Sequence, residues 1–158
     1  MKKIIIAFMA VLLTSVSAHA QFEQGKYYGG LSVSGLDVNY NKADKWNVGV
    51  NGQLGYLFMD DFMVLANLNY SYQAEHSALS IGPALRYYIE QNGIFVGVGA
   101  NYVHRPSGTD ELAPHLSVGY AFFLNGSIAL EPEIYYNQSF KNHDYSGIGL
   151  RVGLGIYF

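Results

Sequence analysis

The last twelve residues of the chain follow a strict two-residue period. Every even-numbered position from Ile148 to Phe158 holds a large apolar residue, namely Ile148, Leu150, Val152, Leu154, Ile156 and Phe158. The odd-numbered positions between them are small or polar, apart from Tyr157. Successive side chains of a β-strand point to opposite faces, so the pattern predicts a strand with one bulky apolar face and one small or polar face.

The same two faces recur seven times upstream. The predicted strands fall within Gly30–Ser34, Trp46–Tyr56, Phe62–Gln73, Leu79–Ile89, Ile94–Tyr102, Leu116–Phe122 and Ser127–Asn137. Pro83 and Pro132 lie on the apolar face in the middle of two of these strands. Proline has no N–H to donate to a sheet, so each predicts a bulge or a local break.

The connections between the segments alternate in length. Asp60–Asp61, Glu90–Gly93 and Asn125–Gly126 are tight turns, whereas Gly35–Lys45, Ala74–Ser77, Arg105–Leu112 and Ser139–Ser146 are polar and mostly longer. Short turns at one end and longer loops at the other are typical of bacterial barrels in a membrane. The sequence therefore predicts an all-β fold, an eight-stranded antiparallel up-and-down transmembrane β-barrel.

The placement of charge indicates which face meets lipid. Charged residues make up 13% of the chain, about half of the ~25% usual in soluble domains. Those well inside the predicted strands are Arg86, Glu131, Glu133 and Arg151, and all four fall on the small or polar face. An Arg or Lys facing lipid at mid-depth costs ~2–4 kcal/mol, and an eight-stranded barrel has little room inside. The bulky face is therefore predicted to point outward, the reverse of a soluble lipocalin-type barrel.

The N-terminus reads as an export signal. Met1-Lys2-Lys3 is a positive start, Ile4–Leu13 is an apolar run, and Ala18-His19-Ala20 is a small-x-small cleavage site. We expect residues 1–20 to be a cleaved signal peptide and residues 21–158 to form the barrel. The mature chain then has 7 basic and 12 acidic residues, which argues against a nucleic-acid partner. The absence of Cys excludes disulfides, thiol catalysis and Cys-ligated zinc.

The hairpin series, the signal peptide and the ending Gly147–Phe158 resemble the small outer-membrane β-barrel superfamily of the OmpA/OmpX type, also called porin-family barrels. The resemblance covers nearly all of the mature chain and implies a monomeric barrel in the outer membrane of the bacterial cell envelope, surrounded by outer-membrane lipid. It also implies that Phe158, Ile156 and Leu154, with Val152 and Leu150 upstream, form the signal that the barrel-assembly machinery reads. It does not imply an activity.

The four charged lumen residues are the first candidates for chemistry. If the last hairpin centres near Asn142, Glu133 faces Arg151 on the neighbouring strand, and Arg86 and Glu131 complete a polar network. Its further members would be Asn47, Asn51, Gln53, Asn67, Asn69 and Asn101. We interpret the network as structural, because a buried charge needs a partner. The alternative is a narrow pore or small-ligand transport barrel that uses the polar lumen.

Histidines and loop acids are the remaining candidates. His76, His104, His143 and His115 lie in or near predicted loops, but no pair has a metal-ligand spacing. Ser139, His143 and Asp144 share one loop, which does not preorganise a catalytic triad. We therefore predict no catalytic residue, no metal site and no cofactor. The function predicted is a non-enzymatic role in envelope integrity or surface interaction, with an extracellular ligand bound through the loops; a rim-located enzyme is a third hypothesis.

Overall fold

The computed structural model describes residues 22–34, 48–72, 77–104, 110–140 and 146–158. No helix within these ranges is long and apolar enough to cross a membrane. The described residues form strands β1 (Tyr27–Ser34), β2 (Val48–Met59), β3 (Phe62–Tyr72), β4 (Ser77–Tyr88), β5 (Ile94–His104), β6 (Glu111–Tyr120), β7 (Phe122–Phe123), β8 (Ile128–Asn137) and β9 (Gly147–Tyr157).

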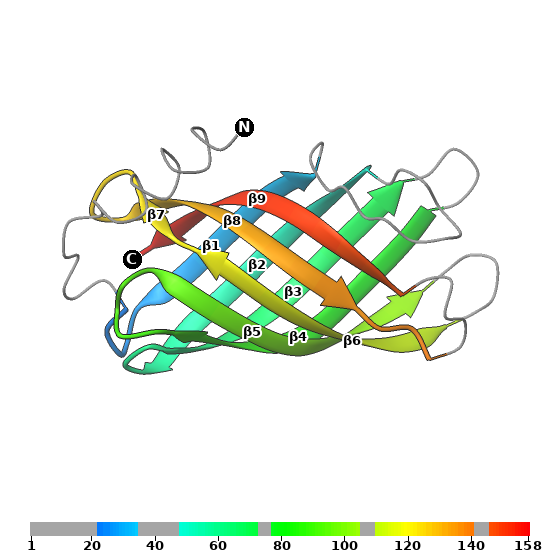
Figure 1. Cartoon of the computed structure of the whole chain (residues 1–158), viewed down its shortest axis with the longest axis horizontal. Helices are drawn as coiled ribbons and strands as arrows, with labels where there is room; N and C mark the ends of the chain where they lie inside the picture. Colours follow the sequence, from blue (N-terminus) through cyan, green and yellow to red (C-terminus); the bar gives the residue numbers. More distant parts are fainter. Residues whose placement is uncertain (1–21, 35–47, 73–76, 105–109, 141–145) are drawn as a thin grey trace, which may run out of the picture.

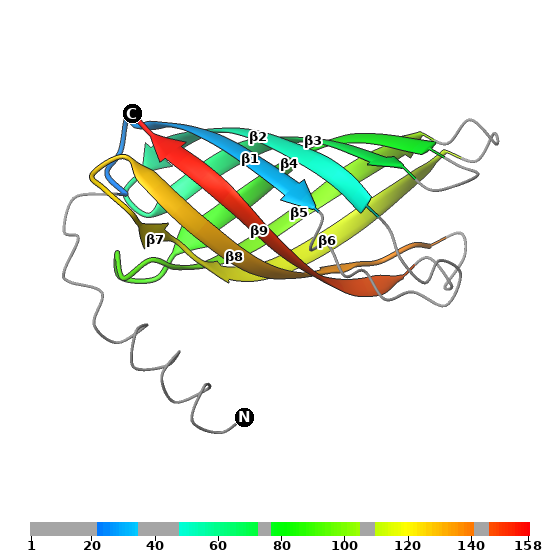
Figure 2. The same ribbon diagram turned by 90° about the horizontal axis from the view of Figure 1, so that it is seen from above.

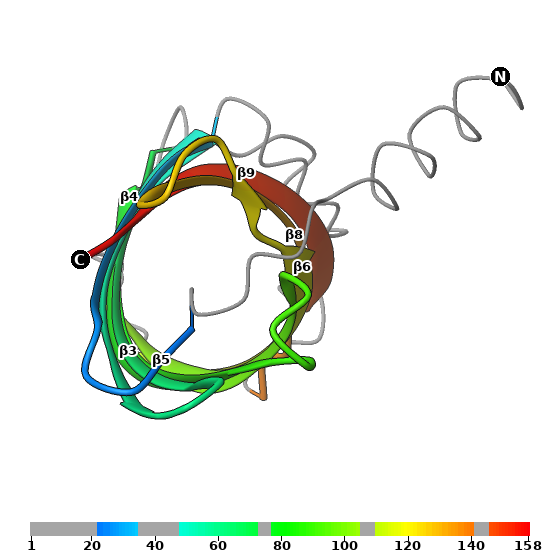
Figure 3. The same cartoon turned by 90° about the vertical axis from the view of Figure 1, so that its left-hand side faces the viewer.

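All strand pairs are antiparallel and the sheet closes on itself. The order is β6-β5-β4-β3-β2-β1-β9-β8-β7, and β6 also pairs with β8. β7 continues the line of β6 after an interruption at Ala121, so the two occupy one position in the ring. The closed ring is seen end-on in Figure 3 and from the side in Figure 1. The predicted eight-stranded up-and-down barrel is confirmed, and closure gives every strand position of the described ring a partner on both sides.

The barrel has two distinct ends. The turns β2–β3, β4–β5 and β7–β8 lie at one end together with the C-terminus (Figures 1 and 2), and we call this the turn end. At the opposite end, the loop end, β1 ends and β2 begins. The strand ends that flank residues 35–47, 73–76, 105–109 and 141–145 lie at this end, and those four ranges are outside the described residues.

Several strand boundaries differ from the sequence prediction, and the shift is largest at the start of β6. β6 begins at Glu111, five residues before the predicted start at Leu116, and β1 begins at Tyr27 rather than Gly30. Within β6 the alternation starts at once, because Glu111, Ala113 and His115 are buried while Leu112 is exposed. The charge and the proline at the start of β6 made this stretch look like a loop. His115 is therefore a lumen residue and not a loop residue.

The two prolines interrupt the sheet on one side only. Pro83 keeps its place opposite Ala66 on β3, but pairing with β5 is missing between Ile81 and Ala84. Pro132 likewise stays opposite Val152, while the β8 pairing is missing between Gly119 and Phe122. The register is the same on both sides of each gap, so each proline marks a local break and not a bulge.

The outward face is apolar, as predicted. Exposed Leu, Ile and Val side chains cover the middle of the barrel, and exposed aromatic side chains lie toward both ends. Tyr56, Phe58, Phe62 and Tyr87 are exposed at the turn end, and Tyr70, Tyr102 and Tyr136 at the loop end. Such rings suit the two interfaces of a membrane, where one part of the ring is in hydrocarbon and the other near water.

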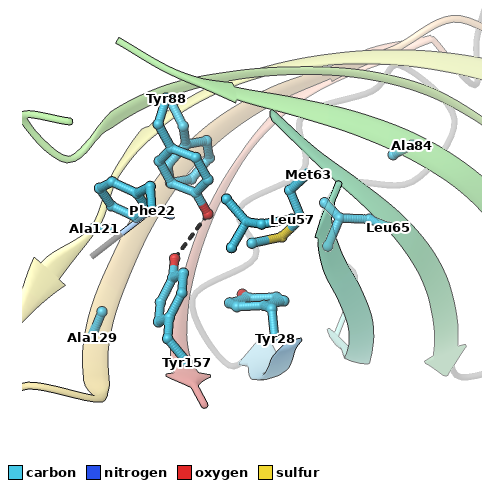
Figure 4. Packing of buried hydrophobic residues seen from close by; sticks show 11 residues of the cluster. Phe22, Tyr28, Leu57, Met63, Leu65, Ala84, Tyr88, Ala121, Ala129 and Tyr157 are labelled. Atoms are coloured by element: carbon cyan, nitrogen blue, oxygen red, sulfur yellow. Dashed lines mark hydrogen bonds between the residues drawn. The ribbon is translucent and has the colours of Figure 1, made fainter. Parts of the chain in front are cut away.

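The inward face changes character along the barrel axis. At the turn end it is apolar and aromatic, with a buried cluster that includes Leu57, Met63, Tyr88, Phe95 and Tyr157 (Figure 4). Farther along, the buried side chains are mainly polar or charged. Met63, Leu65 and Tyr157 are large residues on strand faces that are otherwise small or polar, and in the structure all three belong to this one buried cluster.

Candidate functional site: the barrel lumen

Four charged side chains meet in the lumen, and we call them the charge layer. They are Arg86 from β4, Glu131 and Glu133 from β8, and Arg151 from β9. Arg86 Nη1 lies 3.0 Å from Glu131 Oε2, and Arg86 Nη2 lies 4.0 Å from Glu133 Oε2. Glu133 lies opposite Arg151 in the strand register, as the sequence predicted. The layer holds two cations and two anions, so it carries no net charge.

Glu131 is the most heavily bonded member of the charge layer. Tyr28 donates to its Oε2 over 2.7 Å and Tyr157 donates to its Oε1 over 2.6 Å. The hydroxyls of Tyr88 and Tyr157 lie 2.8 Å apart, as Figure 4 shows. Both oxygens of this buried carboxylate therefore have donors, which is the condition for a buried charge to be tolerated. These tyrosines were not predicted as network members, although Tyr157 is the one aromatic residue on the small or polar face of the last strand.

An amide chain continues the network from Arg86. Arg86 Nη2 donates to Gln53 Oε1 over 3.1 Å, and Gln53 Nε2 donates to Asn67 Oδ1 over 2.9 Å. Asn51 and Asn69 form a separate hydrogen-bonded pair. Asn101 does not join either group, and Asn47 lies outside the described residues. The structure thus brings Gln53 and Asn67 to the charge layer and leaves Asn51, Asn69 and Asn101 apart from it.

Aromatic rings fill the space around the two guanidinium groups. The Arg86 Cζ atom lies 4.1 Å from the ring centre of Phe95 and 5.2 Å from that of Tyr28. Arg151 Cζ lies 5.0 Å from the ring centre of Tyr135. Contacts of this kind add cation–π attraction to the ion pairs and remove space for water.

Little empty space is left at the level of the charge layer. A cavity of about 10 Å³ lies there, lined among others by Tyr28, Ser32, Gln53, Glu131, Glu133 and Arg151. This volume corresponds to about one water molecule. The charge layer and the aromatic rings around it therefore occupy the lumen at this level, and the arrangement is suited to holding the strands together.

The lumen between the charge layer and the loop end is polar but less completely bonded. Ser139 Oγ donates to Glu111 Oε2 over 2.6 Å, and both side chains are buried. Asn51 Oδ1, Asn101 Oδ1 and His115 Nδ1 are buried without a hydrogen-bond partner among the described residues. Buried polar atoms of this kind usually bind water, so this half of the lumen can hold water or a small polar molecule.

Of the candidates for metal binding or catalysis near the loops, His104, His115 and Ser139 lie in the described part of the chain. His104 lies at the end of β5 with Nδ1 2.7 Å from Asp110 Oδ1, and Asp110 also accepts a bond from Tyr102. His76, His143 and Asp144 lie outside the described residues. Among the described residues, no group of three or more His, Cys, Asp or Glu side chains is placed to hold a metal ion. Ser139, which shares a loop with His143 and Asp144 in the sequence, donates its hydroxyl hydrogen bond to Glu111.

The three residues of the predicted assembly signal lie on the outward face of β9. Leu154, Ile156 and Phe158 are all exposed. Phe158 is tied to the first strand by two backbone bonds, one in each direction with Tyr27, of 2.7 and 3.0 Å. The C-terminal residue therefore lies at the β1–β9 seam, at the turn end.

The fold is shared with solved outer-membrane barrels. The N-terminal β-barrel domain of Pseudomonas aeruginosa OprF is 11% identical, covers 86% of this chain and 98% of its own, and gives a TM-score of 0.62. Neisserial surface protein A is 12% identical over 84% of this chain and 96% of its own, with a TM-score of 0.57. Yersinia pestis Ail is 14% identical over 85% and 99%, with a TM-score of 0.55.

A comparison with curated protein sequences gave no match. A family model described as the outer membrane protein beta-barrel domain matches residues 6–158, nearly the whole chain. The closed antiparallel ring, its apolar outer surface and this match agree, so the chain belongs to the outer membrane protein beta-barrel domain family and is a protein of the bacterial outer membrane.

Proposed function

We propose that the protein is a closed, non-conducting and non-enzymatic barrel that serves envelope integrity or contact with the cell's surroundings. The observation that carries this proposal is the charge layer, which leaves a cavity of only about 10 Å³ at its level. To pass, an ion would have to displace Arg86 from Glu131 or Arg151 from Glu133. Removing one partner of a buried ion pair costs ~3–5 kcal/mol, which opposes steady conduction.

The proposal includes an orientation and a processing step. Residues 1–20 are removed as a signal peptide, the turn end faces the periplasm, and the loop end faces outward. The four connections at the loop end then form the contact surface. They contain four basic and four acidic residues in total. Ail has been solved with the heparin analogue sucrose octasulfate, but this balance does not favour a polysulfated ligand here, so the proposed extracellular ligand is a less acidic molecule.

Two further partners belong to the proposal. Outer-membrane lipid covers the exposed apolar side chains, because they form a continuous belt between two aromatic bands. The barrel-assembly machinery reads the C-terminal residues Leu154, Ile156 and Phe158. Their exposure on one face of the last strand, at the β1–β9 seam, supports this role.

A second candidate function is a blind cup for a small polar molecule, open at the loop end. The observation in its favour is the set of buried, unpaired atoms on Asn51, Asn101 and His115 in the described lumen. In this case the charge layer is the floor of the cup and still prevents passage. Transport across the membrane would not occur, but saturable binding of a small polar solute to the purified protein would.

Planar-bilayer recording of the purified protein tests the main proposal. We expect no stepwise conductance from the native protein. The triple variant Arg86→Ala/Glu131→Ala/Phe22→Ala keeps the charge balance, empties the middle of the layer and removes the buried Phe22 ring, which stacks on Tyr88 at the turn end, so it serves as the positive control and should conduct. A gel comparing unheated and boiled samples verifies that each variant is a folded barrel. Steady, reproducible steps from the native protein would overturn the proposal.

A further inference from the structure

The chain segment before β1 enters the lumen at the turn end. In Figure 3 this blue segment lies inside the outline of the ring. Phe22 is only 1% exposed although it precedes the first strand. Its ring stacks on that of Tyr88, with centroids 3.7 Å apart and planes 14° apart. The rings of Phe123 and Tyr157 meet it edge-on, each at 5.6 Å, so Phe22 is enclosed by aromatic rings.

Residues 22–26 are held by one part of the barrel wall, the end of β2 and the β2–β3 turn. Asp61 N donates to Phe22 O over 2.9 Å, and Gln24 N donates to Asp60 Oδ1 over 2.8 Å. Gly25 N donates to Leu57 O, and Leu57 N donates to Lys26 O. The segment lies before the first residue of the β1 ladder. It is therefore attached to the barrel through local bonds and one buried ring.

Gly25 allows the chain to leave the wall and enter the lumen. Its φ is +95°, a conformation that residues with a Cβ atom rarely adopt. A Cβ atom at this position would meet no other atom within 4 Å. Gly25 is thus needed for the backbone conformation and not for space. A substitution at Gly25 should therefore disturb the path of the segment without creating a clash with the barrel.

Phe22 lies between the turn end and the charge layer. Its stacking partner Tyr88 is hydrogen-bonded to Tyr157, and Tyr157 donates to Glu131. Figure 4 shows Phe22 beside Tyr88 and Ala121, at the level of this hydrogen bond. Phe22 therefore contacts directly the two tyrosines, Tyr88 and Tyr157, through which it is linked to Glu131.

We propose that Phe22–Lys26 is a separable plug that closes the turn end of the lumen and can leave its seat while the barrel stays folded. This inference rests on the closed lumen of the proposed function, but it concerns a second closure at a different level. The charge layer blocks ions in the middle of the barrel. The plug keeps water away from the tyrosines that hold Glu131.

Thiol labelling can test the plug because the native chain has no Cys. Ala121→Cys places a reporter in the cluster that contains Phe22, where Ala121 is 3% exposed. Ala113→Cys, at a 9% exposed lumen position of β6 near the loop end, is the matched control. Each is made with Phe22 present and with Phe22→Ala, and is treated with a maleimide in detergent micelles, where both ends meet solvent.

We expect Phe22→Ala to raise the labelling rate at position 121 by at least ~10-fold, because a large buried side chain no longer holds the segment in place. The rate at position 113 should not change. Gly25→Ala should raise the rate at position 121 in the same direction, whereas Gly29→Ala should not. Gly29 also has open space around a Cβ atom but no positive φ. A comparison of the two variants therefore distinguishes the loss of the backbone turn at Gly25 from a general effect of replacing Gly by Ala.

Three results would overturn the plug. Equal rates at position 121 with and without Phe22 would show that Phe22 does not shield it. A joint rise at positions 121 and 113 would show that the whole barrel loosens. Failure of Phe22→Ala to give a heat-modifiable barrel, together with an unchanged rate in Gly25→Ala, would show that the segment is not separable. Conductance of the native protein would overturn the proposed function, but a Phe22-dependent rate at position 121 would still support the plug.

Discussion

Glu133 on β8 lies directly opposite Arg151 on β9, and the two side chains make two contacts. Arg151 Nη2 is 2.8 Å from Glu133 Oε1, and Arg151 Nε is 3.2 Å from Glu133 Oε2. This two-pronged geometry fixes both side chains, since a guanidinium and a carboxylate are planar and match in spacing. The pair joins two neighbouring strands inside the lumen, where little water competes for either group.

Breaking this pair on one side should cost more than removing it. Arg151→Met leaves Glu133 without its main partner and should lower the free energy of unfolding by ~3–5 kcal/mol. In Glu133→Gln/Arg151→Met the remaining Arg86–Glu131 pair is still balanced, so most of this loss should be recovered. Urea unfolding in lipid vesicles measures both. If the double variant were as unstable as the single one, the loss would come from the missing ion pair and not from leaving Glu133 unpaired.

Gly82 should not tolerate a side chain. A Cβ atom at this position would overlap the carbonyl oxygen of Ala100 and lie 2.7 Å from Asn101 Cα, both in the backbone of β5. Gly82→Ala should therefore destabilise the barrel by at least ~1–3 kcal/mol, as overpacking does. Gly52→Ala is the control, because a Cβ there meets its nearest atom at 4.0 Å. Equal folded fractions of the two variants on an unheated gel would contradict the close approach of β4 and β5.

The cost of an outward charge should depend on depth. Leu116 and Leu112 are both outward residues of β6, 59% and 58% exposed. Leu116 lies near the middle of the strand and Leu112 near the loop end. Leu116→Arg should cost ~2–4 kcal/mol and Leu112→Arg ~0–1 kcal/mol. Unfolding titrations in bilayers measure the difference, and equal costs would place the membrane elsewhere on the barrel.

Asp61, in the β2–β3 turn, should make stability depend on pH. Burial raises the pKa of the Asp61 carboxyl above its usual value, and the neighbouring Asp60 carboxylate raises it further. Because its pKa is higher in the folded protein, protonated Asp61 favours the folded state. The stability that this proton binding contributes is fully present below the unfolded-state pKa and is lost as the pH rises through the folded-state pKa.

Asp61→Asn should therefore stabilise the barrel at neutral pH and flatten this pH dependence. Asp61 has a φ of +66°, which Asn adopts readily, so the substitution should not strain the turn. Glu23→Gln, at an exposed acidic position near the same end, is the control for removing a charge. Unfolding curves at several acidic and neutral pH values measure the effect. Parallel pH profiles for the native protein and Asp61→Asn would contradict the assignment.

Phe158 should matter for assembly in cells more than for folding in isolation. Phe158→Ala should reduce the amount of folded barrel in the outer membrane, while spontaneous folding of the purified chain into vesicles changes little. Phe140→Ala is the control, since Phe140 is 73% exposed and Phe158 is 71% exposed. Fractionated membranes and in vitro folding, both analysed on unheated gels, give the two readouts. A similar loss for Phe140→Ala would remove the special role of the C-terminal residue.

The strand series and the sidedness of the barrel could be predicted from the sequence because lipid imposes a simple rule. Residues such as Leu116 and Leu150 must be apolar on one face, while Arg86 and Glu131 can occur only on the other. The facing of Glu133 and Arg151 also followed, since a hairpin with a known centre sets its register. The strands, their inward and outward faces and this facing pair could all be read from the two-residue alternation and the positions of the turns.

The packing of the lumen at the turn end could not be predicted in the same way. Alternation tells that Tyr88, Phe95 and Tyr157 face inward, but not that rings from separate strands meet at one level. That meeting depends on the tilt and stagger of the strands around the ring. Phe22 lies before the first strand and outside any period, so the pattern gives no signal for it. The break in pairing at Pro132 likewise affects only one neighbour, which a single strand's sequence does not reveal.

The donors to Glu131 come from strands that are distant along the chain. Tyr28 belongs to β1, Arg86 to β4 and Tyr157 to β9, and the pairing of β1 with β9, the first and last strands, closes the ring. An open intermediate that lacks either of these two strands leaves this carboxylate without one of its donors. The Glu131 carboxylate therefore has all of its donors only when the ring is complete. Folding of this barrel should be cooperative, with no stable state in which only some of its hairpins are assembled.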